Sequence, residues 1–330
     1  MNSNFKIIDK IIKSCDRIVL STHEKPDADG LGSAIAFYYY LKTINKDVRI
    51  IQPSKYPDDC NIINPENVVD TFCSDDEEWI KSSDLLILFD VGHYKRSKEV
   101  SNIAINNNID VISIDHHKND NIDVFKAFLI DVEAPATGLL VWRYLKKANL
   151  TIPWDIKISN ALYSALMTDT GSFRYNNTTS ECHDMASELI GFGVKPYDMY
   201  VPIYEQRSFS QLRLFSYVVN NLKFSLNNKV CYVIIDKDTF KNTDSKVEDV
   251  DGFTEFLRSI KDVEVSFLIT QQSDDIYRVS FRSKGKYSIN DTAGEFGGGG
   301  HAFAAGAKIS DSNILDIEEK ILNLLKQKMV

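Results

Sequence analysis

Short runs of apolar residues alternate with helical patterns along the first half of the chain. We predict strands at five of these runs, residues 17–22, 47–51, 85–90, 110–115 and 127–131. After the first run, one helix face is marked at i, i+3, i+4 and i+7 spacing by Leu31, Ala34, Ile35, Tyr38 and Leu41. Near-continuous apolar strands separated by helices are typical of a parallel sheet buried on both faces. The pattern therefore predicts an α/β domain.

The hydrophobic period changes towards the C-terminus. Helical patterns dominate from about residue 136 to 220. After residue 222, the runs "KFSL", "KVCYVIID", "VEVSFLIT" and "IYRVSFRS" predict strands, and "SNILDIEEKILNLLKQK" predicts a closing helix. We therefore divide the chain into an α/β domain at 1–188, a helical linker at 189–221 and a smaller α+β domain at 222–330. A length of 330 residues is sufficient for two hydrophobic cores.

Charge and composition narrow the choice of partners. A formal net charge of −9 argues against binding long duplex nucleic acid, which relies on cationic side chains that neutralise phosphates. A small anionic substrate held by a few local cations remains compatible with it. Lysines interrupt the amphipathic N-terminal stretch, and no apolar run is long enough to span a bilayer. With five scattered cysteines and no CxxC pair, we expect a cytoplasmic protein that binds no membrane. The oligomeric state stays open, a homodimer included.

Acidic and imidazole side chains gather at the ends of three predicted strands. They are His23, Asp27 and Asp29 after the first strand, Asp90 at the third, and Asp115, His116 and His117 at the fourth. In an open parallel sheet, ligands bind outside the carboxyl ends of the strands, so these side chains should converge. Turns and helix caps explain each residue singly, for example Asp29-Gly30, but not the set. So many carboxylates would raise each other's pKa, and a pair of divalent cations would remove that cost. We predict a dinuclear metal site.

Two further segments carry candidate chemistry. Asp169 ends a helical stretch where the chain turns through Thr-Gly, a feature that a helix end alone also explains. Glycines 297–300 expose backbone N–H groups to a phosphate or base, and His301 follows at once. Arg282 offers a planar fork for phosphate, and Ser283 offers a hydroxyl. A surface arginine and a buried histidine are the structural alternatives.

These motifs together resemble the DHH phosphoesterase family. In chain order they are "HEKPDADGLGS", "LFDVG", "IDHH", "DTGSFRYNNTT" and "FRS…GEFGGGGHAFAAGA", spanning residues 23–307. The last is similar to the family's associated substrate-binding domain, best known from the nanoRNase/pAp phosphatase branch. The resemblance implies a DHH catalytic domain at 1–188 and a DHH-associated domain at 222–330, with the active site in the cleft between them.

The resemblance also implies a role for each motif residue. Two divalent metal ions would be held, the first by His23 and Asp27, the second by Asp29, His116 and Asp169, with Asp90 bridging both. His117 would lie close to the scissile phosphate and orient or protonate the substrate. Imidazole and carboxylate ligands suit Mn²⁺, with Mg²⁺ or Co²⁺ as substitutes. The expected substrate-binding residues are Arg282, Ser283, Gly298, Gly299, Gly300 and His301. In the mechanism that we expect, a hydroxide bridging both ions attacks phosphorus in line.

We therefore expect an Mn-dependent enzyme that hydrolyses short oligoribonucleotides (nanoRNA) to mononucleotides, or 3′-phosphoadenosine 5′-phosphate (pAp) to AMP. The same chemistry would serve cyclic di-AMP or its linear product pApA. An exonuclease of the RecJ type needs a further nucleic-acid-binding domain, and manganese inorganic pyrophosphatases lack the "GGGGH" segment. A non-catalytic nucleotide sensor would have no need of all six metal ligands. Departures from the family pattern at Leu139, Gln271 and Gln272 leave the fine substrate preference open, and Arg174 could meet either substrate phosphate or a local carboxylate.

Overall fold

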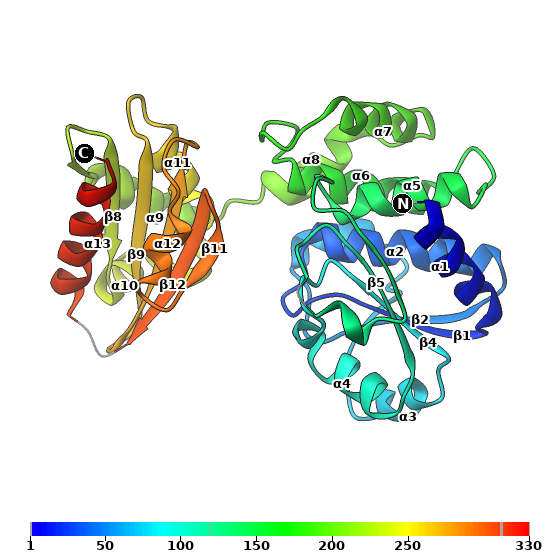
Figure 1. The fold of residues 1–330 in the computed structure, drawn as a ribbon. Helices are drawn as coiled ribbons and strands as arrows, with labels where there is room; N and C mark the ends of the chain where they lie inside the picture. Colours follow the sequence, from blue (N-terminus) through cyan, green and yellow to red (C-terminus); the bar gives the residue numbers. More distant parts are fainter. Residues whose placement is uncertain (1, 120, 311–312, 330) are drawn as a thin grey trace. The chain divides into compact units, whose positions relative to one another are not determined.

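The chain folds into two compact units, the first ending at Gln206 and the second beginning at Arg207 (Figure 1). The structure is a computed structural model and describes residues 2–119, 121–310 and 313–329. The boundary falls inside the segment predicted as a helical linker, 189–221. Helix α8 (Pro196–Tyr204) belongs to the first unit and α9 (Phe209–Asn220) to the second. Leu214 and Val218 explain the second assignment, because they pack into a core of that unit.

The first unit is built on a parallel sheet whose strand order is β3-β2-β1-β4-β5-β6. The strands are β1 (Arg17–Ser21), β2 (Asp47–Gln52), β3 (Val69–Thr71), β4 (Leu85–Phe89), β5 (Asp110–Asp115) and β6 (Ala127–Ile130). This sheet confirms the predicted α/β class and all five predicted strands, while β3 escaped prediction because it is only three residues long. The strand order reverses between β1 and β4, the place where open α/β sheets bind their ligands.

Helices cover both faces of this sheet. They are α1 (Asn2–Ser14), α2 (Ala28–Thr43), α3 (Asp76–Lys81), α4 (Lys98–Asn106), α5 (Thr137–Lys147), α6 (Ile156–Asp169), α7 (Ser180–Gly191) and α8. Successive residues of β4 face opposite sides: Leu85, Ile87 and Phe89 pack with α2 and α5. Leu86 and Leu88 pack with the helices α3 and α4, which lie on the other face (Figure 1). This alternation explains why the strand sequences are apolar throughout.

Close packing of α2 against α6 depends on a glycine. A Cβ placed on Gly32 would lie 2.4 Å from the carbonyl oxygen of Ala161, closer than real atoms approach. The missing side chain lets the two helix backbones come together. Helix α6 carries Asp169 at its end, so this contact positions one of the predicted ligands against the helix that carries Asp29.

The second unit holds a mixed sheet of order β11-β12-β10-β9-β8-β7. The strands are β7 (Lys223–Ser225), β8 (Val230–Ile235), β9 (Val265–Ser273), β10 (Ile276–Ser283), β11 (Gly299–His301) and β12 (Ala304–Ser310). Neighbours are antiparallel except β8 and β9, which run parallel. The sheet confirms the predicted α+β class. Strands β11 and β12 were not predicted, because "GGH" and "AAGAKIS" lack the β-branched and aromatic residues typical of strands.

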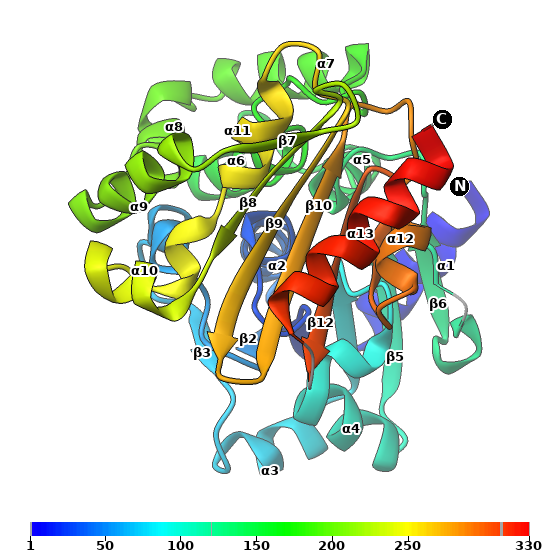
Figure 2. The same ribbon diagram turned by 90° about the vertical axis from the view of Figure 1, so that its left-hand side faces the viewer.

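Each face of the second sheet packs against its own helices. Ile317, Ile321 and Leu325 of α13 (Ile314–Met329) contact one face, on which Figure 2 shows this helix lying across the strands. The other face carries α9, α10 (Lys237–Thr243) and α11 (Phe253–Ser259), and the short α12 (Asn290–Gly294) precedes β11. Among the described residues of both units, no helix is long and apolar enough to cross a membrane.

Candidate metal centre

The predicted ligands of the first unit converge where strands β1, β4 and β5 end. His23 follows β1, Asp90 follows β4, and His116 follows β5. Asp90 has a φ of 57°, a left-handed conformation that is uncommon for residues other than glycine. Such strain persists only where the surroundings enforce it, and it is concentrated at functional sites. The backbone of Asp90 is held by β5, since its N–H donates to the carbonyl of Ile114 at 3.2 Å.

The carboxylate of Asp90 lies between two histidines. Its Oδ2 is 3.6 Å from Nε2 of His23, and its Oδ1 is 3.3 Å from Nε2 of His116. Each oxygen therefore faces a different imidazole, which is the arrangement required of a carboxylate that bridges two ions. The Asp90 side chain is only 3% exposed, so its charge must be compensated by neighbouring groups rather than by bulk water.

Further carboxylates complete a group around each histidine. Oδ2 of Asp27 lies 3.6 Å from Nε2 of His23. Oδ2 of Asp169 lies 3.3 Å, and Oδ2 of Asp29 3.8 Å, from Nε2 of His116. The ligand atoms of His23, Asp27 and Asp90 lie within 4.8 Å of one another, as do those of Asp29, His116 and Asp169. The structure thus brings together all six residues predicted to hold metal.

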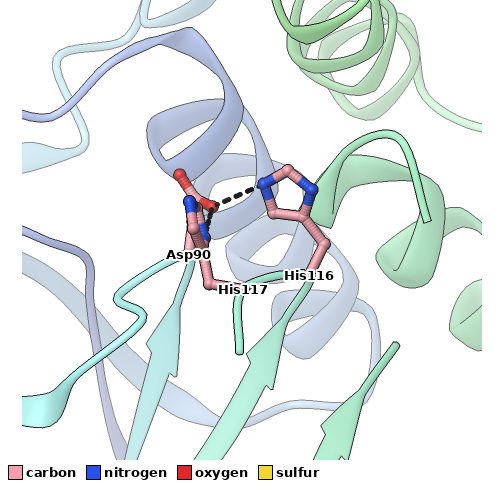
Figure 3. A group of neighbouring side chains, drawn as sticks. All are labelled: Asp90, His116 and His117. Carbon is pink, nitrogen blue, oxygen red and sulfur yellow. Dashed lines mark ion pairs between the residues drawn. The ribbon is translucent and has the colours of Figure 1, made fainter. Parts of the chain in front are cut away.

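A third group of side chains that could hold a metal ion consists of Asp90, His116 and His117. The ligand nitrogen of His117 lies within 4.8 Å of the ligand atoms of Asp90 and His116, and Figure 3 shows both imidazoles directed at the carboxylate. Nδ1 of His117 is 3.2 Å from Oδ1 of Asp90 and 3.0 Å from Oδ1 of Asp115. Proximity alone therefore does not separate a ligand role for His117 from the predicted role beside the substrate.

The tautomers of His23 and His116 suit metal binding. Nδ1 of His23 lies 2.7 Å from the carbonyl of Glu24, and Nδ1 of His116 lies 3.1 Å from the carbonyl of Ala134. A carbonyl only accepts, so Nδ1 carries the proton and Nε2 is directed at the carboxylates. Metal-binding histidines are typically oriented in this way by a backbone acceptor. The donor set of imidazoles and carboxylates therefore fits divalent ions such as Mn²⁺.

The first helical turns hold two of the carboxylates. Oδ1 of Asp27 accepts from the backbone N–H groups of Asp29 and Gly30, which leaves Oδ2 for His23. The oxygens of Asp29 accept from N–H groups at the start of α5, from Thr137 at 2.7 Å and Gly138 at 2.8 Å. Asp29 is fully buried, and the positive end of the α5 dipole stabilises its charge.

The sequence Asp29-Gly30 suggested a tight turn, but Gly30 has another role in the structure. It lies inside the first turn of α2 rather than in a tight turn. A Cβ at this position would lie 2.6 Å from Oγ1 of Thr22 and 3.4 Å from Cβ of Asp90. Gly30 is required because α2 approaches β1 and Asp90 closely.

Asp115, at the end of β5, organises the centre without being one of the predicted ligands. Its Oδ1 accepts from the backbone N–H of His117 at 2.8 Å and from Nδ1 of the same residue. Its Oδ2 accepts from the N–H of Gly92, in the loop after β4. Sequence reasoning placed Asp115 in the cluster but assigned it no role, because its hydrogen bond with Gly92 comes from the backbone of another loop. Thr137 and Gly138 were overlooked for the same reason.

Electrostatics show that the cluster needs positive charge. Burial opposes protonation of His23, but hydrogen bonds with Asp27 and Asp90 outweigh it and raise the pKa to about 10. Burial likewise opposes protonation of His116, whereas Asp90, Asp29 and Asp169 raise its pKa to about 9. Burial and neighbouring carboxylates raise the pKa of both Asp29 and Asp169. Without cations, protons compensate the excess negative charge.

The residues predicted to bind substrate in the second unit lie at one end of its sheet. Ala304 of β12 is paired with Arg282 of β10 on one side and with His301 of β11 on the other. Directly paired residues point to the same face of a sheet, so Arg282 and His301 flank Ala304 on one face. The guanidinium of Arg282 pairs with Glu255 at 2.6 Å, and Ser283 is buried with its Oγ accepting from the N–H of Gly285.

The glycine run is partly explained by the fold. A Cβ on Gly298 would lie 2.2 Å from the carbonyl of Gly306, and one on Gly300 would lie 2.5 Å from that of Ala304. Gly297 and Gly300 also have positive φ, at 71° and 138°. Gly299 has neither feature, and a Cβ there would meet no heavy atom within 4 Å.

Comparison with known proteins matches both units to families. Residues 17–168 match the N-terminal domain of the DHH family, and residues 218–330 match the DHHA1 domain. The chain is 26% identical to a protein of Thermus thermophilus named bifunctional oligoribonuclease and PAP phosphatase NrnA, over 98% of this chain and 94% of that one. A protein of the same name from Bacillus subtilis is 26% identical over 94% of this chain and 96% of that one.

The fold has a close match among solved structures. The crystal structure of an exopolyphosphatase-related protein from Bacteroides fragilis matches with a TM-score of 0.92 and 27% sequence identity. The match covers 99% of this chain and 97% of that chain. The match therefore extends over the folds of both units.

Proposed function

Because the chain belongs to the DHH phosphoesterase family and carries its DHHA1 domain, we propose that it hydrolyses short oligoribonucleotides to mononucleotides and pAp to AMP. The class of enzyme, a phosphodiesterase or phosphatase, follows from the family and from near-full-length relatives. The substrates rest on the names of those relatives. Cyclic di-AMP and pApA are the alternative substrates for the same chemistry.

The position of Asp90 is the observation that carries the proposal. Its two oxygens face His23 and His116, and each histidine has its own further carboxylates. We assign His23 and Asp27 to one ion, Asp29, His116 and Asp169 to the other, and Asp90 to both. When bound, two Mn²⁺ ions would supply a nucleophile at neutral pH and neutralise charge on the phosphoryl group.

His117 contributes a proton in this proposal. Burial opposes its protonation, but hydrogen bonds with Asp115 and Asp90 raise its pKa to about 10. Asp115 accepts the Nδ1 proton and fixes the ring, and we assign the Nε2 proton to the leaving oxygen. General acids of this kind typically contribute about 10²- to 10⁴-fold to the rate.

The side chain of Asp27 leaves the centre accessible. It is 55% exposed, whereas those of Asp90 and Asp29 are 3% and 0% exposed. Ions and a phosphate group can therefore approach from the Asp27 side. In the second unit, we assign Arg282, His301 and the exposed backbone of Gly299 to substrate binding, with Ser283 supporting the adjacent loop from its buried position.

A comparison of substrates tests the proposal. The purified full chain with Mn²⁺ is offered pAp, pApA, a short RNA and cyclic di-AMP in parallel, and the initial rates are compared. We expect pAp and the short RNA to have the highest kcat/KM, and a chelator to abolish hydrolysis. Hydrolysis of cyclic di-AMP alone, or rates that a chelator leaves unchanged, would contradict the proposal.

A further inference from the structure

The first unit holds its arginines in two different ways. Arg17 pairs with Asp47, Arg49 with Asp70 and Asp76, and Arg143 with Asp131 and Glu181. Arg96 and Arg174 differ, because no carboxylate of the described residues lies within 4.0 Å of either guanidinium. Both instead donate to a backbone carbonyl, Nη1 of Arg96 to Val91 at 3.2 Å and Nε of Arg174 to Gly171 at 2.7 Å.

Both residues follow a predicted metal ligand closely in the chain, Arg96 in the 3-10 helix Tyr94–Ser97 and Arg174 in the turn after α6. Arg96 is six residues after Asp90, and Arg174 is five residues after Asp169. Nη1 of Arg96 lies 4.0 Å from the position that a Cβ on Gly92 would take, and the ring carbon Cγ of His117 lies 3.6 Å from the same position. The guanidinium of Arg96 and the ring of His117 therefore both border the space beside Gly92.

A strained turn directs Arg174 back towards the end of α6. Gly171, Ser172 and Phe173 have φ values of 56°, 58° and 62°, a left-handed run in which two residues are not glycine. Hydrogen bonds enforce it: the N–H of Ser172 donates to Met167, and that of Phe173 to Oγ1 of Thr170. Strain of this kind persists where a fixed geometry is required.

Asn177 links this turn to the metal centre. Its Nδ2 donates to the backbone carbonyl of Asp169 at 3.0 Å and to that of Pro135 at 3.3 Å. The segment from Asp169 to Asn177 is therefore closed on itself, with the Arg174 guanidinium held over its first turn. Such anchoring reduces the conformational entropy that the side chain loses when it binds a ligand.

We propose that Arg96 and Arg174 bind phosphate oxygens of the substrate. The inference rests on the proposed function and extends it to the substrate's phosphates. A guanidinium that donates one hydrogen bond to a carbonyl still has further N–H groups for a ligand. These N–H groups lie in one plane, in a geometry that matches two oxygens of a phosphate. Substrates such as pAp and pApA carry a second phosphate besides the one hydrolysed, and that group needs cations that the acidic ligands cannot provide.

The test replaces each arginine by glutamine, which keeps a polar side chain but removes the charge. Arg17→Gln is the matched control, because it removes the same charge from the opposite end of β1. We expect Arg96→Gln and Arg174→Gln to raise the KM for pAp and pApA about 10- to 100-fold, with unchanged melting temperature and Mn²⁺ affinity. Lysine at either position should recover only part of the loss, since it lacks the fork.

A smaller substrate separates the two kinds of phosphate. If a glutamine variant hydrolyses both bis-p-nitrophenyl phosphate and pAp less efficiently than wild type, its arginine binds the scissile phosphate. If only the hydrolysis of pAp is impaired, the arginine binds the phosphate that is not hydrolysed. If wild type hydrolyses pAp and both glutamine variants match Arg17→Gln, the inference is wrong while the proposed function stands. A wild-type protein that hydrolyses none of these substrates overturns the proposed function and this inference with it.

Discussion

The hydroxyl of Thr137 donates a 3.1 Å hydrogen bond to Oδ1 of Asp90, the oxygen that faces His116. The backbone N–H of the same residue donates to Asp29 at 2.7 Å. Thr137 is fully buried at the start of α5 and so ties together two carboxylates from different strand ends. The orientation of Asp90 therefore depends on a residue that binds no metal in our assignment.

Removing this hydroxyl should weaken metal binding. Thr137→Val keeps the shape but removes the donor, and a hydrogen bond to a charged group contributes about 1.5–3 kcal/mol. We expect Mn²⁺ affinity, measured by isothermal titration calorimetry, to fall about 10-fold or more. Thr137→Ser keeps the donor and should bind Mn²⁺ nearly as wild type does. Equal affinities of the valine and serine variants would show that the hydroxyl does not position Asp90.

The two adjacent histidines should respond differently to substitution. His116→Ala removes a ligand flanked by Asp29 and Asp169, so it should lower the metal content. His117→Ala should keep the metal and lower kcat about 10²- to 10⁴-fold, as expected for a lost general acid. Metal analysis and kinetics on the same preparations separate the roles. Retained metal in His116→Ala with lost metal in His117→Ala would mean that the assignments must be exchanged.

Mn²⁺ binding should depend on pH in a defined direction. The carboxylates raise the pKa of His23 to about 10 and that of His116 to about 9, so both are protonated at neutral pH. An ion must displace these protons, and its affinity should therefore rise between about pH 6 and pH 8 with release of protons. Titrations in buffers of different ionisation enthalpy measure that release. His183 lies outside the centre, so His183→Gln should leave the number of released protons unchanged. An Mn²⁺ affinity that does not depend on pH would show that the ion displaces no protons from His23 and His116.

The glycine run can be divided into structural and functional positions. Gly298→Ala should destabilise the fold by about 1–3 kcal/mol, because its Cβ would collide with Gly306. Gly299→Ala has room in the fold and should keep the melting temperature of wild type, but its methyl group should raise the KM for pAp by crowding a substrate bound at this exposed backbone. Thermal unfolding and kinetics are measured on both. An unchanged KM in Gly299→Ala would remove this residue from the binding site.

The sequence predicted most clearly what depends on local pattern. The strands β1, β4 and β5 are continuous apolar runs, and the polar residues that follow them necessarily meet at one edge of the sheet. The contacts of Asp115, Thr137 and Gly138 were beyond prediction, because they join loops distant in sequence through backbone N–H groups.

The strands and ion pairs of the second unit were harder to predict, because they too depend on contacts between segments distant in sequence. Strand β12 is rich in alanine and glycine and forms because β10 pairs with it along seven residues. The ion pair of Arg282 with Glu255 arises from the packing of α11 beside β10, and sequence spacing gives no sign of it. The charge of Arg282 is thus partly compensated before any substrate binds.

Metal content of wild type and Asp90→Ala tests the two-ion centre most directly. Both proteins are saturated with Mn²⁺, dialysed and analysed by inductively coupled plasma mass spectrometry, with Asp123→Ala as a control for the loss of an exposed carboxylate. The two-ion assignment predicts two Mn²⁺ per chain in wild type and the control, and loss of bound metal and of pAp hydrolysis in Asp90→Ala. An Asp90→Ala protein that retains both ions and turns over near the wild-type rate would contradict it.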